Sequence, residues 1–378
     1  MSHKTAQMMD KQSICRSLVN WFSQSKRDLP WRREPTPYRV WISEIMLQQT
    51  QIERAIPFFT TWMQRLPTVQ DTAEADRETL FKLWEGLGYY RRVINIHRTA
   101  RILKEKHGNS LPVDHPLLLT LPGIGPYTAG AIMSLAFNKP YPAVDANVQR
   151  LLCRVLDIGE PVTKTTVQKR LHHAAAALIL PEHAREVNQA LMECGALICM
   201  PRSPRCEQCP MSQACLARRR GVVEQRPLKA KPRKMTHLET VVGILVREGR
   251  ILVQKRPETG LMPGLWEFPG GKLQQGETPQ KGLQREIQEE LGIDVQVGEI
   301  LATVRHSYTS FRVRLQAYFC TPVSNKEQLR PQAAEEVYWA APHELPGFSF
   351  PAANRRLVTL LARLDPGELN KRLPQQLI

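Results

Sequence analysis

The spacing of hydrophobic positions divides this chain into two parts. Residues 12–24, 40–52, 78–107 and 164–198 carry apolar side chains at helical intervals, which predicts a first part made of packed helices. From Thr236 the pattern changes, because the apolar runs 240–246 and 250–256 flank a short Arg-Glu-Gly turn and predict strands. Between the two parts, residues 218–235 are rich in Arg, Lys and Pro and have no apolar period. We therefore expect domains at residues 1–217 and 236–378, joined by a basic linker at 218–235.

The charge composition predicts a binding partner for the first part of the chain. The chain has 378 residues, which suits two domains, and a net charge of +16. Residues 236–378 hold 17 basic and 16 acidic side chains, so an excess of +15 lies in residues 1–235. Charge confined to one part favours a polyanion partner over a merely solvated basic surface. No stretch approaches the roughly 18 apolar residues of a membrane span, and the N-terminus has no apolar signal core, so we expect a cytosolic protein.

The stretch Leu121-Pro-Gly-Ile-Gly-Pro-Tyr-Thr organises the first part. Gly123 and Gly125 allow a tight turn with an open backbone, and Pro126 suits the first turn of a helix that we expect to run from Tyr127 to about Phe137. The N–H groups at that helix start favour a phosphate. The pattern predicts a helix-hairpin-helix that grips a nucleic-acid backbone, although an ordinary hairpin of two helices also uses glycine here.

Two carboxylates near this stretch are candidates for chemistry. Glu44 is alone among the apolar residues of its predicted helix, and burial would raise its pKa toward that of a general acid; a salt-bridged structural Glu is the alternative. Asp145 stands at a predicted helix start, where the default role is an N-cap. Held behind a phosphate-gripping turn, it could also face a sugar and stabilise an oxocarbenium-like cation.

Four cysteines form one compact set. The pattern Cys199-x6-Cys206-x2-Cys209-x5-Cys215 gives four thiolates in a short loop, which suits either tetrahedral zinc or a [4Fe–4S] cluster. Zinc sites more often use two Cys-x2-Cys pairs, and only one is present here, so the spacing favours the cluster. Disulfides are not expected in a reducing compartment.

Together these motifs resemble the MutY-type adenine DNA glycosylases, which are helix-hairpin-helix enzymes with an iron–sulfur loop. The matching segments include Leu29-Pro-Trp-Arg, Ser43-Glu-Ile-Met-Leu-Gln-Gln-Thr-Gln, Gly86-Leu-Gly-Tyr-Tyr and Val144-Asp-Ala-Asn-Val. The sister endonuclease-III-type enzymes carry a lysine nucleophile where this chain has Tyr127, so the resemblance implies a monofunctional glycosylase. It implies that Glu44 protonates adenine and Asp145 stabilises the sugar cation, with Tyr127 and Asn147 supporting them. It also implies that Trp31, Arg32 and Gln189 contact the flipped adenine, that Gln49, Leu87 and Tyr89 fill the base stack, and that Gly123 and Gly125 hold the backbone.

The second part carries a complete Nudix signature from Gly271 to Ile293. Glu286, Glu289 and Glu290 fall on one face of its predicted helix, where Mg2+ could relieve their repulsion. MutY-type proteins have a C-terminal domain that resembles MutT-type Nudix hydrolases and checks for 8-oxoguanine, usually with a degraded box. This chain departs from the family pattern in its intact box, and in Tyr308-Thr309-Ser310, where the family typically has Phe-Ser-His. Asn354 is a further candidate contact to oxidised guanine.

The expected fold is thus an all-α helix-hairpin-helix glycosylase domain with a [4Fe–4S] loop, followed by an α+β Nudix (MutT-like) domain. The expected function is that of a base-excision-repair hydrolase, a cytoplasmic monomer acting in the nucleoid of a bacterium. It would remove adenine mispaired with 8-oxoguanine or guanine in duplex DNA, with Mg2+ as a possible second cofactor of the Nudix domain. Two alternatives are a bifunctional fusion that also hydrolyses oxidised dGTP, and a non-catalytic iron–sulfur DNA-binding sensor.

Overall fold

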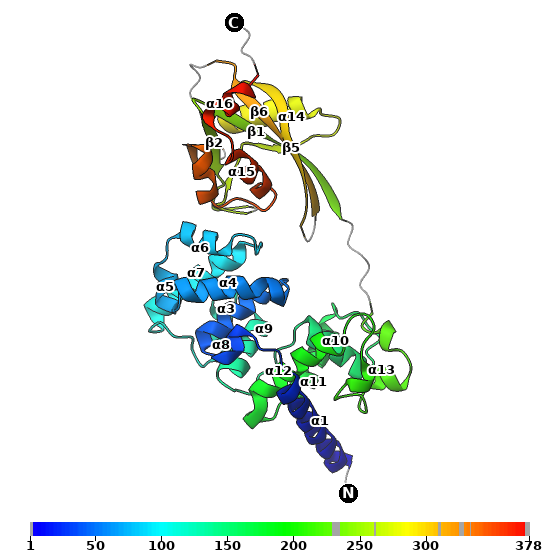
Figure 1. Ribbon diagram of the computed structural model, residues 1–378. Coiled ribbons are helices and arrows are strands. Elements are labelled where there is room, and N and C mark those ends of the chain that lie inside the picture. Colours follow the sequence, from blue (N-terminus) through cyan, green and yellow to red (C-terminus); the bar gives the residue numbers. More distant parts are fainter. Residues whose placement is uncertain are drawn as a thin grey trace. The chain divides into compact units, whose positions relative to one another are not determined.

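A computed structural model describes residues 3–228, 235–260, 262–308, 311–324, 329–332 and 334–374. It confirms a helical first part and an α+β second part (Figure 1). Contacts divide the chain into two compact units, Met1–Ala75 with Ile94–Pro232, and Asp76–Val93 with Arg233–Ile378. No helix of the described residues is long and apolar enough to cross a membrane.

The first unit is built from packed helices. In α3 the N-cap Thr36 and the following Pro37 start the helix, and nearly every side chain from Tyr38 to Met46 is buried. A core forms between α1, α10, α11 and α12, and it extends to the cysteine loop. The helices are α1 (His3–Ser25), α2 (Pro30–Arg33), α3 (Pro37–Leu47), α4 (Ile52–Arg65), α5 (Val69–Glu74), α7 (Arg91–Lys106), α8 (His115–Thr120), α9 (Pro126–Ala131), α10 (Ala146–Val155), α11 (Thr165–Leu178), α12 (Ala184–Leu197) and α13 (Leu216–Arg219).

The predicted helix-hairpin-helix is formed by α8, the turn Leu121–Gly125 and α9. Gly123 has φ of +79°, and a Cβ there would lie 2.8 Å from Asn95 Cβ, so glycine is required. Gly125 is extended rather than left-handed, and open space surrounds the position of its absent Cβ. The helical stretch after the turn has about the predicted extent, but its last turn differs in type, because α9 ends at Ala131 and continues as one π-helical turn, Ile132–Ala136.

The second unit is a mixed sheet with helices on both faces. Its strands are β1 (Thr236–Arg247), β2 (Arg250–Lys255), β3 (Trp266–Glu267), β4 (Gly270–Lys272), β5 (Val295–Ser307), β6 (Phe311–Pro322) and β7 (Glu336–Ala340). The order is β3-β2-β1-β6-β5, with β4 beside β1, β7 beside β2, and β1 parallel to β6. Alternate residues of β1 face α14 (Pro279–Leu291) on one side and α15 (Arg355–Leu361) on the other. The helix α16 (Pro366–Lys371) adds Leu369 to the second of these cores.

The segment Asp76–Val93 belongs to the second unit by its contacts, although it precedes most of the first unit in sequence. It contains α6 (Arg77–Trp84) and the glycine turn that follows it. Lys82 Nζ donates to the backbone oxygen of Pro346 at 2.5 Å, and Glu85 lies 3.9 Å from Arg355. The two units are therefore not identical to the domains that the sequence predicts.

Candidate active site

The candidate active site is a cavity of about 530 Å³ in the first unit, a volume within the range of small-molecule sites. The end of α3, the start of α9, the start of α10 and the last turns of α12 meet around it. Of the predicted site residues, those that line it are Trp31, Arg32, Glu44, Gln49, Tyr127, Asp145, Asn147 and Gln189.

Glu44 lies in this cavity as the buried carboxylate that the sequence predicts. Its side chain comes from the apolar helix α3 and is 5% exposed. Tyr127 Oη donates a hydrogen bond to Glu44 Oε2 at 2.5 Å. Burial raises the pKa of Glu44 to about 7; the charge of Asp145 adds to this rise, and the Tyr127 hydrogen bond opposes it. At neutral pH, Glu44 is therefore poised between its acid and its anionic form.

Asp145 is both an N-cap and a cavity residue, so the two interpretations from the sequence are compatible. Its Oδ1 accepts the backbone N–H of Val148 at 2.7 Å, which caps α10. Its Oδ2 accepts Asn147 Nδ2 at 2.8 Å. Burial raises its pKa, and these two donors act against that rise. The carboxylate is thus fixed by its helix start and aimed into the same cavity as Glu44.

A third carboxylate, Glu193, was not found by sequence reasoning. It lies on α12, is 1% exposed and lines the cavity. Arg27 donates to both of its oxygens at 2.9 and 2.8 Å, and Arg32 does so at 3.1 and 2.9 Å. Burial acts to raise its pKa, but the two arginines outweigh burial and lower it to about 2. The signal in the sequence was an acidic residue among the apolar positions of a predicted helix, as for Glu44.

In the Leu29-Pro-Trp-Arg loop, the side chains of Trp31 and Arg32 are held by contacts within the protein. Arg32 is engaged by Glu193, and Trp31 packs edge-on against Phe59 with ring centroids 5.3 Å apart. Both side chains still line the cavity. They therefore form its wall, and their contact with a flipped base stays a prediction.

The predicted stack-filling residues are not all in this unit. Gln49 is exposed at the cavity and has a left-handed backbone, with φ of 56°. Leu87 and Tyr89 belong to the second unit, where Leu87 is 6% exposed and Tyr89 is 44% exposed with φ of 52°. The exposed ring of Tyr89 is thus the more accessible of the two, and the roles of all three stay predictions.

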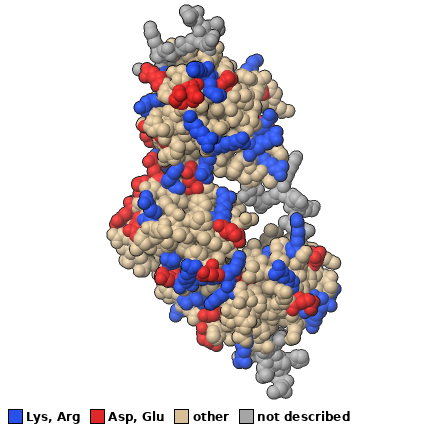
Figure 2. All heavy atoms as spheres, in the orientation of Figure 1, with Lys and Arg blue, Asp and Glu red and all other residues tan. Residues whose placement is uncertain are grey.

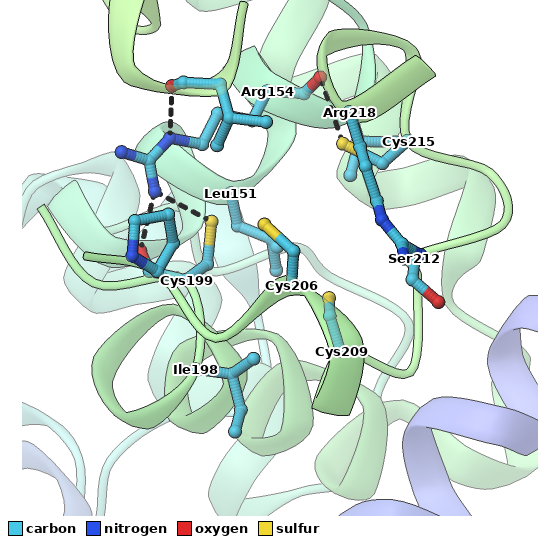
Figure 3. A pocket seen from close by; sticks show the side chains of 12 residues that line it. Leu151, Arg154, Ile198, Cys199, Cys206, Cys209, Ser212, Cys215 and Arg218 are labelled. Atoms are coloured by element: carbon cyan, nitrogen blue, oxygen red, sulfur yellow. Dashed lines mark hydrogen bonds between the residues drawn. The ribbon is translucent and has the colours of Figure 1, made fainter. Parts of the chain in front are cut away.

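The four predicted metal-binding cysteines line one pocket (Figure 3). Arg154, which is buried, donates to Cys199 Sγ at 3.2 Å and to backbone oxygens of the same loop. Its neighbour Arg150 donates to the Cys199 backbone oxygen at 2.7 Å and to Asn147 Oδ1 at 2.8 Å, which connects the loop to the carboxylate site. The remaining three cysteines of the set are Cys206, Cys209 and Cys215.

This donor set fits a group held by several thiolates. In the figure, Cys199, Cys206 and Cys209 lie around a common opening, and Cys215 lies at its far side (Figure 3). A hydrogen bond with Cys194 lowers the pKa of the Cys209 thiol, which favours the thiolate that a metal needs, whereas burial raises the pKa of Cys199 and Cys215. Among the described residues, no three acidic, histidine or cysteine side chains are placed close enough to hold a single ion as they stand.

The comparisons with known proteins agree with this geometry. Residues 42–176 match the HhH-GPD superfamily of base excision DNA repair proteins, and residues 240–360 match the NUDIX domain. The adenine DNA glycosylase of Homo sapiens is 36% identical over 358 residues, which cover 80% of this chain and 66% of that protein. The adenine DNA glycosylase of Rattus norvegicus is 34% identical, with coverages of 84% and 72%. This chain belongs to the adenine DNA glycosylase family.

The resemblance seen in the sequence is thereby confirmed for the family and the fold. Among solved structures, a thermostable thymine-DNA glycosylase is similar to the helical part of this family member, with a TM-score of 0.53 and 28% identity. The match covers 57% of this chain and 99% of that chain.

In the Nudix helix of this family member, two of the three predicted glutamates are paired with an arginine. Arg285 pairs with Glu286 at 2.9 Å and with Glu289 at 3.2 Å, and it also binds Glu277. Glu290 accepts Gln254 Nε2 at 2.8 Å and the Gly270 N–H at 3.0 Å. The arginine of the signature therefore offsets part of the negative charge of these glutamates.

Glu290 nevertheless keeps an unusual environment. Burial raises its pKa to about 7, the hydrogen bonds from Gly270 and Gln254 oppose this rise, and the charges of Glu267 and Glu286 add to it. Glu267, which sequence reasoning did not select, is itself paired with Arg256. The charges of Glu267 and Glu286 therefore act on Glu290, which is bonded to the Gly270 N–H.

The structure describes two of the four residues that were predicted to contact 8-oxoguanine. Tyr308 packs against His306 and Phe311, with ring centroids 4.5 and 4.7 Å away. Asn354 is buried just before α15. The predicted contacts Thr309 and Ser310 lie outside the described residues.

Proposed function

We propose that this chain is an adenine-specific DNA N-glycosylase that hydrolyses the bond between adenine and deoxyribose, without lyase chemistry. The observation that carries the proposal is that Glu44 and Asp145 face one cavity, each held by a different partner. Two carboxylates in different environments can divide acid and electrostatic roles, as they do in glycoside hydrolysis. The target base must first leave the duplex to enter such a cavity.

Glu44 is the proposed acid. Tyr127 donates to Oε2, which leaves Oε1 to carry the proton toward a ring nitrogen of adenine. With a pKa of about 7, the protonated form is present at neutral pH. Protonation removes electron density from the glycosidic bond and turns adenine into a neutral leaving group.

Asp145 is the proposed stabiliser of the sugar cation. Bond breaking leaves positive charge on the deoxyribose, and a fixed anionic oxygen near C1′ lowers the energy of that state or captures it covalently. Asn147 and the Val148 N–H hold the carboxylate in place, so little reorganisation is needed during reaction. Water then takes the place of adenine on the sugar.

The proposed substrate is duplex DNA with adenine opposite 8-oxoguanine or guanine, and the enzyme is proposed to act as a monomer. The hairpin turn at Gly123–Gly125 would hold the backbone, since the Gly125 surroundings leave room for a phosphate. Figure 2 shows basic side chains interspersed with acidic ones over the face drawn there, so the charge excess is not gathered in one patch on that face. Tyr308 and Asn354 are the proposed readers of the oxidised base.

The four cysteines are proposed to hold a [4Fe–4S] cluster. Four thiolates from residues 199–215 match the ligand set of a cubane cluster. Bound there, a cluster would join four points of the loop and so fix the position of the Arg150 contacts to Asn147 and Cys199.

Two variants of the full-length chain test the glycosylase proposal. Glu44→Gln and Asp145→Asn should each lose single-turnover release of adenine by at least about a hundredfold, the low end of what a positioned acid contributes. Both should still bind duplex DNA, because neither group is assigned to phosphate. Full activity in both variants would refute the proposed chemistry, whereas DNA binding by an inactive wild-type protein would favour a non-catalytic iron–sulfur sensor.

A second candidate function is hydrolysis of oxidised dGTP by the Nudix part. The observation that favours it is that two glutamates of the signature lie against adjacent glycines: Glu290 Oε2 accepts the Gly270 N–H at 3.0 Å, and the Glu286 carboxylate lies where a Cβ of Gly271 would stand. Mg2+ bridging such carboxylates and a diphosphate would relieve their repulsion.

The test uses the full-length chain with Mg2+ and 8-oxo-dGTP. Pyrophosphate release should appear in the wild type, be lost in Glu290→Gln, and persist in the control Glu299→Gln, whose side chain is exposed on β5. An equal rate in the wild type and Glu290→Gln would remove this second function without affecting the first.

A further inference from the structure

A fifth cysteine lies directly behind the four that line the pocket. Cys194 is on α12, one turn before Cys199, and its side chain is 0% exposed. Its Sγ lies 3.9 Å from Cys209 Sγ, within hydrogen-bonding distance for two sulfurs. Cys209 lines the pocket and Cys194 does not. Cys194 is therefore placed as a neighbour of a ligand rather than as a ligand.

The backbone fixes this contact. The oxygen of Cys194 accepts the N–H of Ile198 at 3.0 Å and that of Cys199 at 2.8 Å, at the point where the helix ends and the cysteine loop begins. The side chain is part of the core formed by α1, α10, α11 and α12, and Cys209 packs against that core. A close-packed interior of this kind keeps the two sulfurs near each other.

The direction of the hydrogen bond follows from the chemistry of the ligand. When both residues are thiols, either sulfur can donate. A cysteine bound to iron is a thiolate and has no proton. The remaining proton is then on Cys194, which stays neutral because a second buried anion beside the first would be costly.

We propose that Cys194 donates an S–H···S hydrogen bond to the iron-bound thiolate of Cys209 and thereby raises the reduction potential of the cluster. This inference rests on the proposed [4Fe–4S] assignment. A hydrogen bond to a ligand sulfur withdraws electron density from it and stabilises the more negative, reduced state of a cluster. Arg154 makes the equivalent bond to Cys199 at 3.2 Å. Cys194 thus tunes the cluster without touching iron.

The experiment uses full-length protein purified without oxygen. Cys194→Val removes the donor and keeps a similar volume, whereas Cys194→Ser keeps a donor. The matched control is Cys153→Val, because Cys153 is equally buried in the same core on α10. Iron content and absorption at about 400 nm are measured first, and the midpoint potential is then measured by redox titration.

All four proteins should contain the cluster. The midpoint potential should fall in Cys194→Val and stay close to the wild-type value in Cys194→Ser and Cys153→Val. Equal shifts in both Cys194 variants would show a packing effect and overturn the proposal, as would no shift in Cys194→Val. If Cys194→Val cannot hold iron, Cys194→Ala replaces it, and a wild-type potential there overturns the proposal.

The premise and the inference fail in different ways. Wild-type protein with zinc, or without iron, would refute the cluster assignment before any potential is measured. Wild-type protein with iron and an unshifted Cys194→Val would refute only the role of Cys194.

Discussion

The pH dependence of adenine release is the most direct consequence of the geometry around Glu44. A glutamate with a pKa near its usual value of 4.5 would be about 0.3% protonated at pH 7, whereas one with a pKa of about 7 is half protonated. Burial of this side chain therefore raises the protonated fraction about 150-fold. If protonated Glu44 is the acid, the single-turnover rate should be constant below pH 6 and should fall about tenfold per unit above pH 8.

The variant Tyr127→Phe tests the sign of this argument. The Tyr127 hydroxyl stabilises the Glu44 anion and so lowers its pKa. Its removal should move the falling limb of the rate profile to higher pH by about one unit, since a hydrogen bond to a charged group is worth about 1.5 kcal/mol or more. Tyr141→Phe is the control, because Tyr141 does not line the cavity. A limb that moves to lower pH, or a rate that is flat from pH 6 to 9, would refute the reasoning.

Three further predictions concern stability and DNA binding. The folded pKa of Glu44 is above the unfolded value, so the native state holds the extra proton, and the contribution of Glu44 to the free energy of unfolding falls by about 3 kcal/mol from pH 4.5 to pH 7. Glu44→Gln should therefore unfold at a higher urea concentration than the wild type at pH 8, and equal urea midpoints would contradict this. Glu193→Gln leaves two arginines facing each other without their shared anion and should lower the unfolding free energy by about 3 kcal/mol; urea titration at pH 7 checks it. Gly123→Ala must place a Cβ against Asn95 at positive φ and should cost about 1–2 kcal/mol and weaken duplex binding, whereas Gly125→Ala should be tolerated in stability.

The sequence predicts well the features that depend on local pattern. The glycine turn, the N-cap at Asp145 and the buried stripe around Glu44 are each written in a few adjacent residues, and the structure has all three. The hairpin differs in detail, because only Gly123 needs a left-handed backbone and the following helix continues as a π turn. The local spacing of residues thus determines which element forms, whereas tertiary packing determines the geometry of its last turn.

Features that depend on distant pairs could not be predicted in this way. Glu193 is paired with Arg32 and Arg27, which are 161 and 166 positions away from it in the sequence. No local sequence pattern predicts a pair over such a separation. The Nudix helix shows the same limit at short range. Its glutamates share one face as predicted, yet Arg285 pairs with Glu286 and Glu289 and so offsets part of the repulsion from which a metal was inferred.

The division of labour between Glu44 and Asp145 follows from where each stands on its helix. Glu44 is inside α3, where the backbone N–H groups are already bonded within the helix, so burial raises the pKa of its carboxyl group against only the Tyr127 hydroxyl and the charge of Arg32. Asp145 is at the start of α10, where a free N–H and a neighbouring amide meet the carboxylate. Both pKa values are raised, but the second group has donors that hold it as an anion. A position inside a helix thus favours the acid form of Glu44, and a position at a helix start favours the anionic form of Asp145. Exchanging the two residue types, with Asp at position 44 and Glu at position 145, should therefore impair both the acid and the anionic role.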